Sequence, residues 1–283
     1  MLNSLMRLYD ACFPGIVRER KTVERILSLP ENHILLREEA GQPIAAAVIH
    51  GSVILMLCVL PEKQGRGIGS ALLQEAEAYI LAQGHAEVRF CDGPGYITPG
   101  VPDYPGAWAF FEKRGYTHSW GDCECVDMSR PLLGYEHTAY SIGDTVNGYT
   151  YRWAVLSDIP AIADCVDTAE ENFTKYYRNE DLYNGQGTQR VLIAEDGRLV
   201  CGTLIVSAET EQKGVGSVGC TATRADRQNR GIATTMVKLG TKYLFDLGLP
   251  TAFLGYTYTD IVRMYGRAGY AICRKYMMAV KTF

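Results

Sequence analysis

A glycine-rich turn between an apolar run and a helical segment occurs twice in this chain. The first copy follows the apolar run 52–60 and has the sequence Gln64-Gly65-Arg66-Gly67-Ile68-Gly69. The second copy stands in the same context and has the sequence Gln228-Asn229-Arg230-Gly231-Ile232-Ala233. Small residues let backbone N–H groups gather where the following helix begins, and open donors together with the helix dipole favour an anion there. We therefore predict that each turn can hold an anionic group such as a diphosphate.

The repeat extends beyond the turn. An offset of about 164 residues places Tyr79 on Tyr243 and Gly84 on Gly248. At an offset of about 154 residues, Phe111-Glu112-Lys113-Arg114-Gly115-Tyr116 matches Tyr265-Gly266-Arg267-Ala268-Gly269-Tyr270. Two long copies indicate two copies of one domain, because two units are too few for a solenoid. We predict an N-terminal domain at 1–133, a linker at 134–148 and a C-terminal domain at 149–283.

Length and composition agree with two globular domains. The 283 residues are 47% hydrophobic and 21% charged, and each half is long enough to bury its own core. A net charge of −4 and the lack of a long apolar run give no support to a nucleic-acid or membrane partner. The first residues lack the apolar core of a signal peptide, and the nine cysteines show no regular spacing. We therefore expect a cytoplasmic protein with reduced thiols. The pattern Cys123-Glu124-Cys125 suits a strand better than a metal site, so no metal is expected.

Hydrophobic periodicity predicts a mixed order of helices and strands in both copies. In the first copy the expected helices are 2–13, 16–29 and 68–83, and the expected strands are 33–37, 43–50, 52–60 and 86–91. In the second copy the expected strands are 149–156, 189–195, 199–209, 215–223 and 251–256, and the expected helices are 231–247 and 260–267. A Pro/Gly-rich stretch at 92–106 is extra in the first copy, and predicts a surface loop or the wall of a substrate site.

The two copies differ at their start. Trp153, in the first predicted strand of the second copy, lies about 78 residues before Gly231, and the same distance before Gly67 falls ahead of Met1. The first domain is therefore expected to lack this strand. Its sheet edge would stay open, or would be covered by residues 138–145 or by a partner chain, which makes a homo-oligomer a hypothesis.

The turn and its flanking elements resemble the GNAT superfamily of acyl-CoA-dependent N-acetyltransferases. The family signature is a strand followed by Gln/Arg-x-x-Gly-x-Gly/Ala, and residues 59–69 match it fully. Residues 223–233 match it with Thr223 for the usual apolar residue, Ala225 for the usual proline and Ala233 for the last glycine. The resemblance covers nearly the whole chain as a tandem. It implies a mixed α/β (α+β) fold of two domains, each with a central, mostly antiparallel sheet flanked by helices.

The resemblance also implies acetyl-CoA as co-substrate and an amine as acceptor. We expect a small-molecule amine, while an amino acid, an aminoglycoside-like drug, a protein terminus and a longer acyl chain are all compatible with the sequence. The diphosphate of acetyl-CoA would lie on the turns and its pantetheine along the ends of the preceding strands, whose amides would polarise the thioester carbonyl. In the first copy these residues are Cys58, Val59, Leu60, Gln64, Gly65, Arg66, Gly67, Ile68, Gly69 and Ser70. In the second copy they are Thr221, Ala222, Thr223, Gln228, Asn229, Arg230, Gly231, Ile232, Ala233 and Thr234.

One tyrosine is implied as the general acid. Members of the family often protonate the departing thiolate with the tyrosine of a helix of pattern Leu-Tyr-x-x-x-Gly-Phe, which residues 264–270 match with Tyr265. The first copy has Phe111 there, which carries no acidic proton, so catalysis is expected in the C-terminal domain. A plain core aromatic is the alternative for Tyr265.

The base and the acceptor site are less defined. The predicted strand 215–223 holds no carboxylate, so deprotonation would run through water to an acidic residue: Glu209, Glu171, Asp167 or Asp260. Several tyrosines are candidates for lining the acceptor pocket, or for plain aromatic packing: Tyr176, Tyr177, Tyr183, Tyr256 and Tyr258.

Three hypotheses about function therefore stand. The first is an N-acetyltransferase that acts on a primary amine in its C-terminal domain. The second places catalysis in the N-terminal domain, whose turn matches the signature better. The third is a non-enzymatic module that binds acyl-CoA or a partner.

Overall fold

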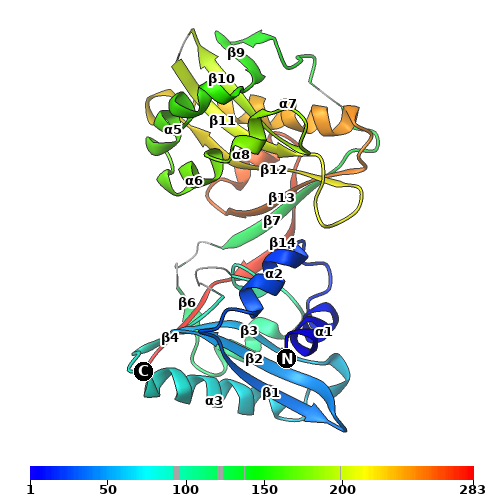
Figure 1. Cartoon of the computed structure of the whole chain (residues 1–283), viewed down its shortest axis with the longest axis vertical. Coiled ribbons are helices and arrows are strands. Elements are labelled where there is room, and N and C mark those ends of the chain that lie inside the picture. The colour runs from blue at the N-terminus through cyan, green and yellow to red at the C-terminus, as the bar shows by residue number, and fades with distance from the viewer. Residues whose placement is uncertain (92–95, 120, 122–123, 137, 198) are drawn as a thin grey trace. The chain divides into compact units, whose positions relative to one another are not determined.

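We describe the protein from a computed structural model, in which residues 1–91, 96–119, 121, 124–136, 138–197 and 199–283 are described (Figure 1). The chain divides into two compact units. Unit 1 comprises Met1–Val126 and Arg274–Phe283, and unit 2 comprises Asp127–Cys273. Each unit is a mixed α+β layer structure, as predicted, and each is treated separately below.

Unit 1 is a sheet with helices on both faces. Its strands run in the order β1-β2-β3-β4-β15-β6, and the β3–β4 pair is parallel while the other described pairs are antiparallel. Its helices are α1 (Leu2–Cys12), α2 (Arg20–Leu27), α3 (Ile68–Ala82) and α4 (Ala107–Glu112), with a 3-10 turn η1 (Pro61–Lys63). Its strands are β1 (His33–Glu39), β2 (Gln42–His50), β3 (Val53–Val59), β4 (Glu87–Phe90), β5 (Val101–Pro102), β6 (Thr117–His118) and β15 (Ala279–Thr282).

Strand alternation divides the core of unit 1 into two layers. Ala46 and Val48 of β2 face the cluster under α1 and α2, while Ala45, Ala47 and Ile49 face the cluster under α3 and α4. Figure 1 shows α3 on one side of this sheet and α1 with α2 on the other. Both faces of the central strands are covered, so the strands are almost wholly apolar.

Unit 2 repeats this plan. Its strands run in the order β14-β7-β13-β12-β11-β10-β9-β8, to which β14 contributes residues 271–273 and β7 residues 127–131. Residues 274–277 of β14 belong to unit 1, where Tyr276 and Met277 pair with β5. The strands are β7 (Cys125–Pro131), β8 (Thr145–Val146), β9 (Tyr149–Trp153), β10 (Gln189–Asp196), β11 (Leu199–Ser207), β12 (Val215–Thr223), β13 (Thr251–Tyr258) and β14 (Ala271–Met277). The helices are α5 (Ile159–Asp167), α6 (Thr174–Tyr177), α7 (Ile232–Asp246) and α8 (Val262–Gly266), with 3-10 turns η2 (Leu156–Asp158), η3 (Glu171–Phe173), η4 (Glu180–Tyr183) and η5 (Ala225–Arg227). A Cβ on Gly202 would lie 2.7 Å from Met236, so glycine there lets α7 approach the sheet closely.

The two halves of the sequence exchange strands. The C-terminal β15 pairs with β4 and completes the sheet of unit 1, whereas residues 127–131 of β7 lie beside β13 in unit 2. The two units therefore interleave along the chain, which differs from the continuous ranges 1–133 and 149–283 expected from the repeat. Local hydrophobic alternation fixes which face of a strand is buried, but does not specify which sheet the strand joins.

The outer edges of the two sheets also differ. In unit 2, β9 pairs with β10, and Thr145 and Val146 of β8 pair in turn with β9. In unit 1, β1 stands at the end of the strand order among the described residues. Thr145, at the end of the segment 138–145, pairs with Thr150 of β9 in the sheet of unit 2.

A buried ion pair ties β15 to α3. The ammonium of Lys281 lies 3.0 and 3.1 Å from the two carboxylate oxygens of Glu77, and only 11% of the Glu77 side chain is exposed. Burial and the nearby Glu77 carboxylate raise the pKa of Tyr116. At the equivalent place in unit 2, Thr241 makes a 2.9 Å hydrogen bond with Tyr270 instead.

We expect Lys281→Met to destabilise unit 1 by about 2 kcal/mol, because the Glu77 carboxylate loses its counter-ion in a largely desolvated place. Urea unfolding, with hydrogen exchange of α3 as a local probe, measures this loss. Adding Glu77→Gln to Lys281→Met removes the uncompensated charge and is expected to recover most of the stability. An unchanged α3 exchange rate in the single variant would contradict this account.

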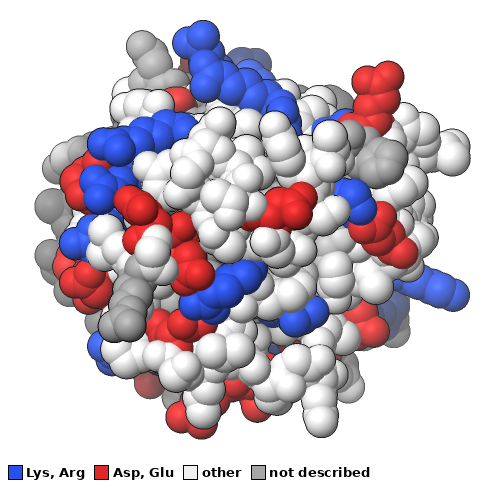
Figure 2. Space-filling view, turned by 90° about the horizontal axis from the view of Figure 1, so that it is seen from above, with Lys and Arg blue, Asp and Glu red and all other residues white. Residues whose placement is uncertain are grey.

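The charged surface, the helices and the possible metal ligands bear on the question of a nucleic-acid, membrane or metal partner. On the face seen in Figure 2, basic and acidic side chains are interspersed. None of the helices in the described part of the chain combines the length and apolarity needed to cross a bilayer. The described residues contain no group of three His, Cys, Asp or Glu side chains placed to hold a metal ion, and Cys123 lies outside the described residues.

Candidate functional site

The two glycine-rich turns have the same backbone geometry. Gly67 precedes α3 and Gly231 precedes α7, and both have φ of 81°, a left-handed value that favours glycine. Gly65 and Asn229 also have positive φ, at 74° and 60°. No side chain caps either helix, so the first N–H groups of both helices remain open to an anion.

The polar side chains of the signature hold the turns in shape. The amide of Gln64 donates to the carbonyl of Val59 at 3.1 Å, and Gln228 does the same to Thr223 at 3.4 Å. The guanidinium groups of Arg66 and Arg230 each donate to the carbonyl four residues earlier, at 3.3 Å. The Gln and Arg side chains of the turns therefore stabilise the loop conformation. The backbone N–H groups are the part of each turn that is available to bind a ligand.

The strand that leads into the second turn separates from its parallel neighbour. In unit 2 the pairing of β12 with β13 ends at Ser217 and Phe253, although both strands continue to Thr223 and Tyr258. In unit 1 the β3–β4 register ends at Ile54 and Phe90, where β4 itself ends. In unit 2 a gap therefore opens beside the predicted strand end 221–223. An extended chain with amide groups could pair with the strand edge there.

A polar atom at this strand end is without a partner. The hydroxyl of Thr223 is buried and makes no hydrogen bond within the described part of the chain. Its equivalent in unit 1 is Val59. A hydroxyl without a partner at the strand end, together with open helix N–H groups at the turn, would suit a ligand that carries both amide and phosphate groups, as pantetheine diphosphate does.

The strand β12, which borders this gap, carries a backbone bulge in its pairing with β11. Thr203 pairs with Ala222 and Ile205 pairs with Gly219, so one residue of β11 faces both Cys220 and Thr221. Cys220 has a φ of 49°, which is unfavourable for a residue with a side chain. The buried Tyr177 of α6 donates its phenol to the carbonyl of Cys220 and fixes the bulge. The bulge of unit 1 is at Leu55 and has no residue with positive φ.

Tyr265 enters the gap from α8. Its phenol donates to the hydroxyl oxygen of Thr221 at 3.0 Å, and its side chain is almost fully buried. Burial raises the pKa of Tyr265 to about 12, and the hydrogen bond with Thr221 lowers it in part. Tyr265 therefore stays protonated at neutral pH and can donate a proton or a hydrogen bond. In unit 1 the equivalent positions are Phe111 and Leu57, which pack in the same apolar cluster.

The candidate acceptor residues divide into separate groups. Tyr177 and Tyr183 are buried under α5 and α6, where Tyr183 donates to the carbonyl of Tyr177 at 2.6 Å. Tyr256 and Tyr258 contact each other on β13, with ring centroids 6.1 Å apart. Tyr176 is 48% exposed. Tyr177 and Tyr183 therefore belong to the core of unit 2, and Tyr256 and Tyr258 form a pair on β13.

Of the candidate bases, Asp167 accepts a hydrogen bond from the hydroxyl of Thr174 at the end of α5. The backbone carbonyl of Glu209 accepts one from Ser207 at 2.6 Å. These contacts anchor both residues, and the choice of base stays a prediction.

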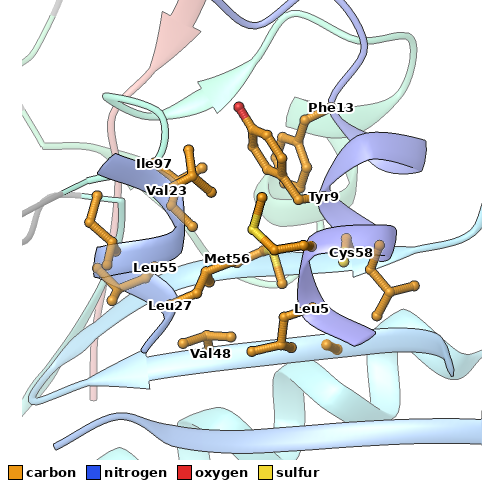
Figure 3. Packing of buried hydrophobic residues seen from close by; sticks show 14 of the residues in the cluster. Leu5, Tyr9, Phe13, Val23, Leu27, Val48, Leu55, Met56, Cys58 and Ile97 are labelled. Carbon is orange, nitrogen blue, oxygen red and sulfur yellow. The ribbon is translucent and has the colours of Figure 1, made fainter. Parts of the chain in front are cut away.

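The extra stretch of the first copy is not a plain surface loop. Residues 92–95 lie outside the described part, but Ile97 and Val101 are buried in the two core clusters of unit 1. Figure 3 shows Ile97 beside Val23, over the strand that carries Leu55 and Met56. The stretch therefore contributes one buried side chain to each face of the sheet, which its Pro/Gly composition did not reveal.

Sequence reasoning missed one basic residue at the first turn. Arg114 follows α4, donates to the hydroxyl of Ser70 at 2.6 Å and lies 3.8 Å above the ring of Phe110. Its guanidinium thereby stands at the first turn of α3. The equivalent residue in unit 2 is Ala268, and this difference between the copies was the available signal.

Comparison with protein families identifies the family to which both units belong. A family model for the acetyltransferase (GNAT) domain matches residues 30–118, and one for the acetyltransferase (GNAT) family matches residues 156–270. The chain belongs to the GNAT acetyltransferases. The tandem predicted from the repeat is thereby confirmed, and acyl-CoA-dependent N-acetyl transfer is the general activity that this membership supports. No curated protein matches the sequence.

Solved structures show the same tandem fold. A GCN5-related glucosamine N-acetyltransferase region of a fungal multi-domain GH3 β-N-acetylglucosaminidase is 18% identical with a TM-score of 0.73. The match covers 99% of this GNAT chain but 36% of the fungal one. A GCN5-related N-acetyltransferase from Sphaerobacter thermophilus is 20% identical, with a TM-score of 0.70 and 99% and 91% of the two chains covered. A tandem GNAT protein from the clavulanic acid biosynthesis pathway is 14% identical, with a TM-score of 0.69 and 99% and 94% covered. At these identities the likeness concerns the fold alone.

Proposed function

We propose that the protein transfers an acetyl group from acetyl-CoA to a primary amine of a small molecule, and that unit 2 carries out the catalysis. The observation that carries the proposal is the pair of hydroxyl groups of Tyr265 and Thr221 beside the bulge. Unit 1 has Phe111 and Leu57 at the same places, so it lacks a proton donor there.

Different groups of unit 2 would bind the co-substrate, stabilise the oxyanion and transfer the protons. The open N–H groups at the start of α7 would hold the diphosphate, and the hydroxyl of Thr223 would meet a pantetheine amide. Backbone N–H groups at the bulge would stabilise the oxyanion that forms when the amine nitrogen attacks the thioester carbon. As the carbon–sulfur bond breaks, Tyr265 would give its proton to the sulfur. The ammonium proton of the acceptor would leave through water to Glu209, Glu171, Asp167 or Asp260.

The residue at the position of the proton donor argues against the same reaction in unit 1. Phe111 stands there in place of Tyr265, and it packs in an apolar cluster. The turn of unit 1 keeps the open N–H groups and gains the charge of Arg114. These features favour unit 1 as a second binding site for acetyl-CoA without turnover.

Calorimetric titration with acetyl-CoA, combined with an assay for thiol release in the presence of a panel of primary amines, tests this function. We expect binding, and CoA release that depends on the amine. Binding without CoA release from any amine would instead support a binding module. The absence of binding heat in several buffers would reject both the acetyltransferase and the acyl-CoA-binding module. The stoichiometry reports whether one turn or both are occupied.

A further inference from the structure

We propose that Thr221 is a positioning residue for Tyr265, so that the two hydroxyl groups act as one proton-donating unit. This inference rests on the proposed function of unit 2. It gives Thr221 a role beyond that of a strand residue along the pantetheine.

The geometry makes Thr221 the fixed partner. Thr221 directly follows Cys220, whose carbonyl is held by the buried phenol of Tyr177. Tyr265 belongs to α8, a helix of five residues. Its phenol reaches β12 through the 3.0 Å bond to the Thr221 hydroxyl. A rigid strand bulge therefore sets the place of a side chain on a short helix, which has few hydrogen bonds of its own to resist rotation.

The two copies of the domain supply an internal comparison. The positions of Thr221 and Tyr265 both carry hydroxyl groups in unit 2, and both carry apolar side chains, Leu57 and Phe111, in unit 1. Leu57 and Phe111 pack in one cluster without a polar atom to satisfy. A buried phenol needs a partner, whereas a phenyl ring does not. We therefore infer that the hydroxyl at position 221 serves as the hydrogen-bond partner of Tyr265. The strand itself does not require it, since unit 1 has a leucine there.

The proton balance explains what Thr221 adds. When Tyr265 protonates the departing sulfur, its O–H bond breaks, an S–H bond forms, and a phenolate remains until solvent returns a proton. The Thr221 hydroxyl can then rotate and donate to the phenolate. Burial raises the pKa of Tyr265 to about 12, far above the value of about 8.5 of an ordinary thiol, so transfer to the thiolate is uphill. The hydrogen bond with Thr221 lowers the pKa of Tyr265 and so reduces this barrier.

The test compares Thr221→Val, Thr221→Ser, Tyr265→Phe and the double variant Thr221→Val/Tyr265→Phe in steady-state assays. We expect Thr221→Val to lower kcat about 10- to 100-fold, within the range of an impaired acid. The KM for acetyl-CoA should change less than about threefold, and Thr221→Ser should recover kcat to within about threefold. In the Tyr265→Phe background, Thr221→Val should add no further loss, because both act through one proton.

The matched control is Thr241→Val, which breaks another threonine–tyrosine hydrogen bond of unit 2, the 2.9 Å contact of Thr241 with Tyr270. It should lower the unfolding midpoint without lowering kcat. An undiminished loss from Thr221→Val in the Tyr265→Phe background would overturn the inference, as would full kcat in Thr221→Val. If the wild-type protein releases no CoA with any amine, the proposed function itself fails, and that result precedes all variant comparisons.

Discussion

Tyr265→Phe is expected to lower kcat about 100- to 1000-fold, the usual effect of removing a general acid. The loss follows because the departing thiolate has no proton donor at the bulge of β12. The raised pKa of Tyr265, about 12, keeps the phenol protonated at every lower pH, so the loss should be the same from about pH 6 to pH 9. Stopped-flow or steady-state detection of the released thiol measures kcat, and calorimetry should show the Kd of acetyl-CoA within about threefold of wild type.

A neighbouring tyrosine provides the control for this substitution. Tyr270 is also buried, and its ring centroid lies 6.3 Å from that of Tyr265, but its hydroxyl bonds to Thr241. Tyr270→Phe therefore removes one buried phenol oxygen from the same unit and should leave kcat within about threefold of wild type. Equal losses in the two variants would show that Tyr265 acts through packing. Unchanged turnover in Tyr265→Phe would remove it from the mechanism.

The turns and their helices could be predicted closely from the sequence. Helices were expected at 68–83 and 231–247, and the structure has Ile68–Ala82 and Ile232–Asp246. The reason is local, because a glycine at positive φ marks each start and another glycine follows each end. The duplicated spacing predicted two copies of one domain, and the resemblance of the turns to the GNAT signature predicted the domain type. The family comparison confirms both.

The strand exchange and the catalytic geometry depend on long-range contacts and could not be predicted. The apolar pattern of 279–282 fits either sheet, and its place beside β4 is decided by partners about 190 residues earlier in the chain. The bulge at Cys220 gave no local signal, since no glycine or asparagine marks its positive φ. The contact between Thr221 and Tyr265 follows from that bulge. The sequence indicated both residues but not their pairing.

Thr234→Asp is expected to weaken acetyl-CoA binding in unit 2 about 100-fold. Thr234 lies in the first turn of α7, beside the open N–H groups proposed to hold the diphosphate. A carboxylate about 5 Å from a phosphate charge costs about 3 kcal/mol at an effective dielectric constant of about 20. An aspartate in the first turn also stabilises the helix, so folding should be preserved. The loss should appear as a raised KM for acetyl-CoA and a lost calorimetric site. The neutral Thr234→Asn should stay within about threefold of wild type.

Ser70→Asp makes the same change at the equivalent place in unit 1 and separates the roles of the two turns. There the new carboxylate would also pair with Arg114, whose guanidinium already contacts Ser70 at 2.6 Å. If unit 1 binds acetyl-CoA without turnover, Ser70→Asp should remove one binding site from the titration while kcat at saturating acetyl-CoA remains. If turnover falls with Ser70→Asp and survives Thr234→Asp, catalysis belongs to unit 1, and Phe111 shows that its chemistry proceeds without a phenol at that place. A loss of turnover in both variants would mean that an occupied unit 1 is required for catalysis in unit 2.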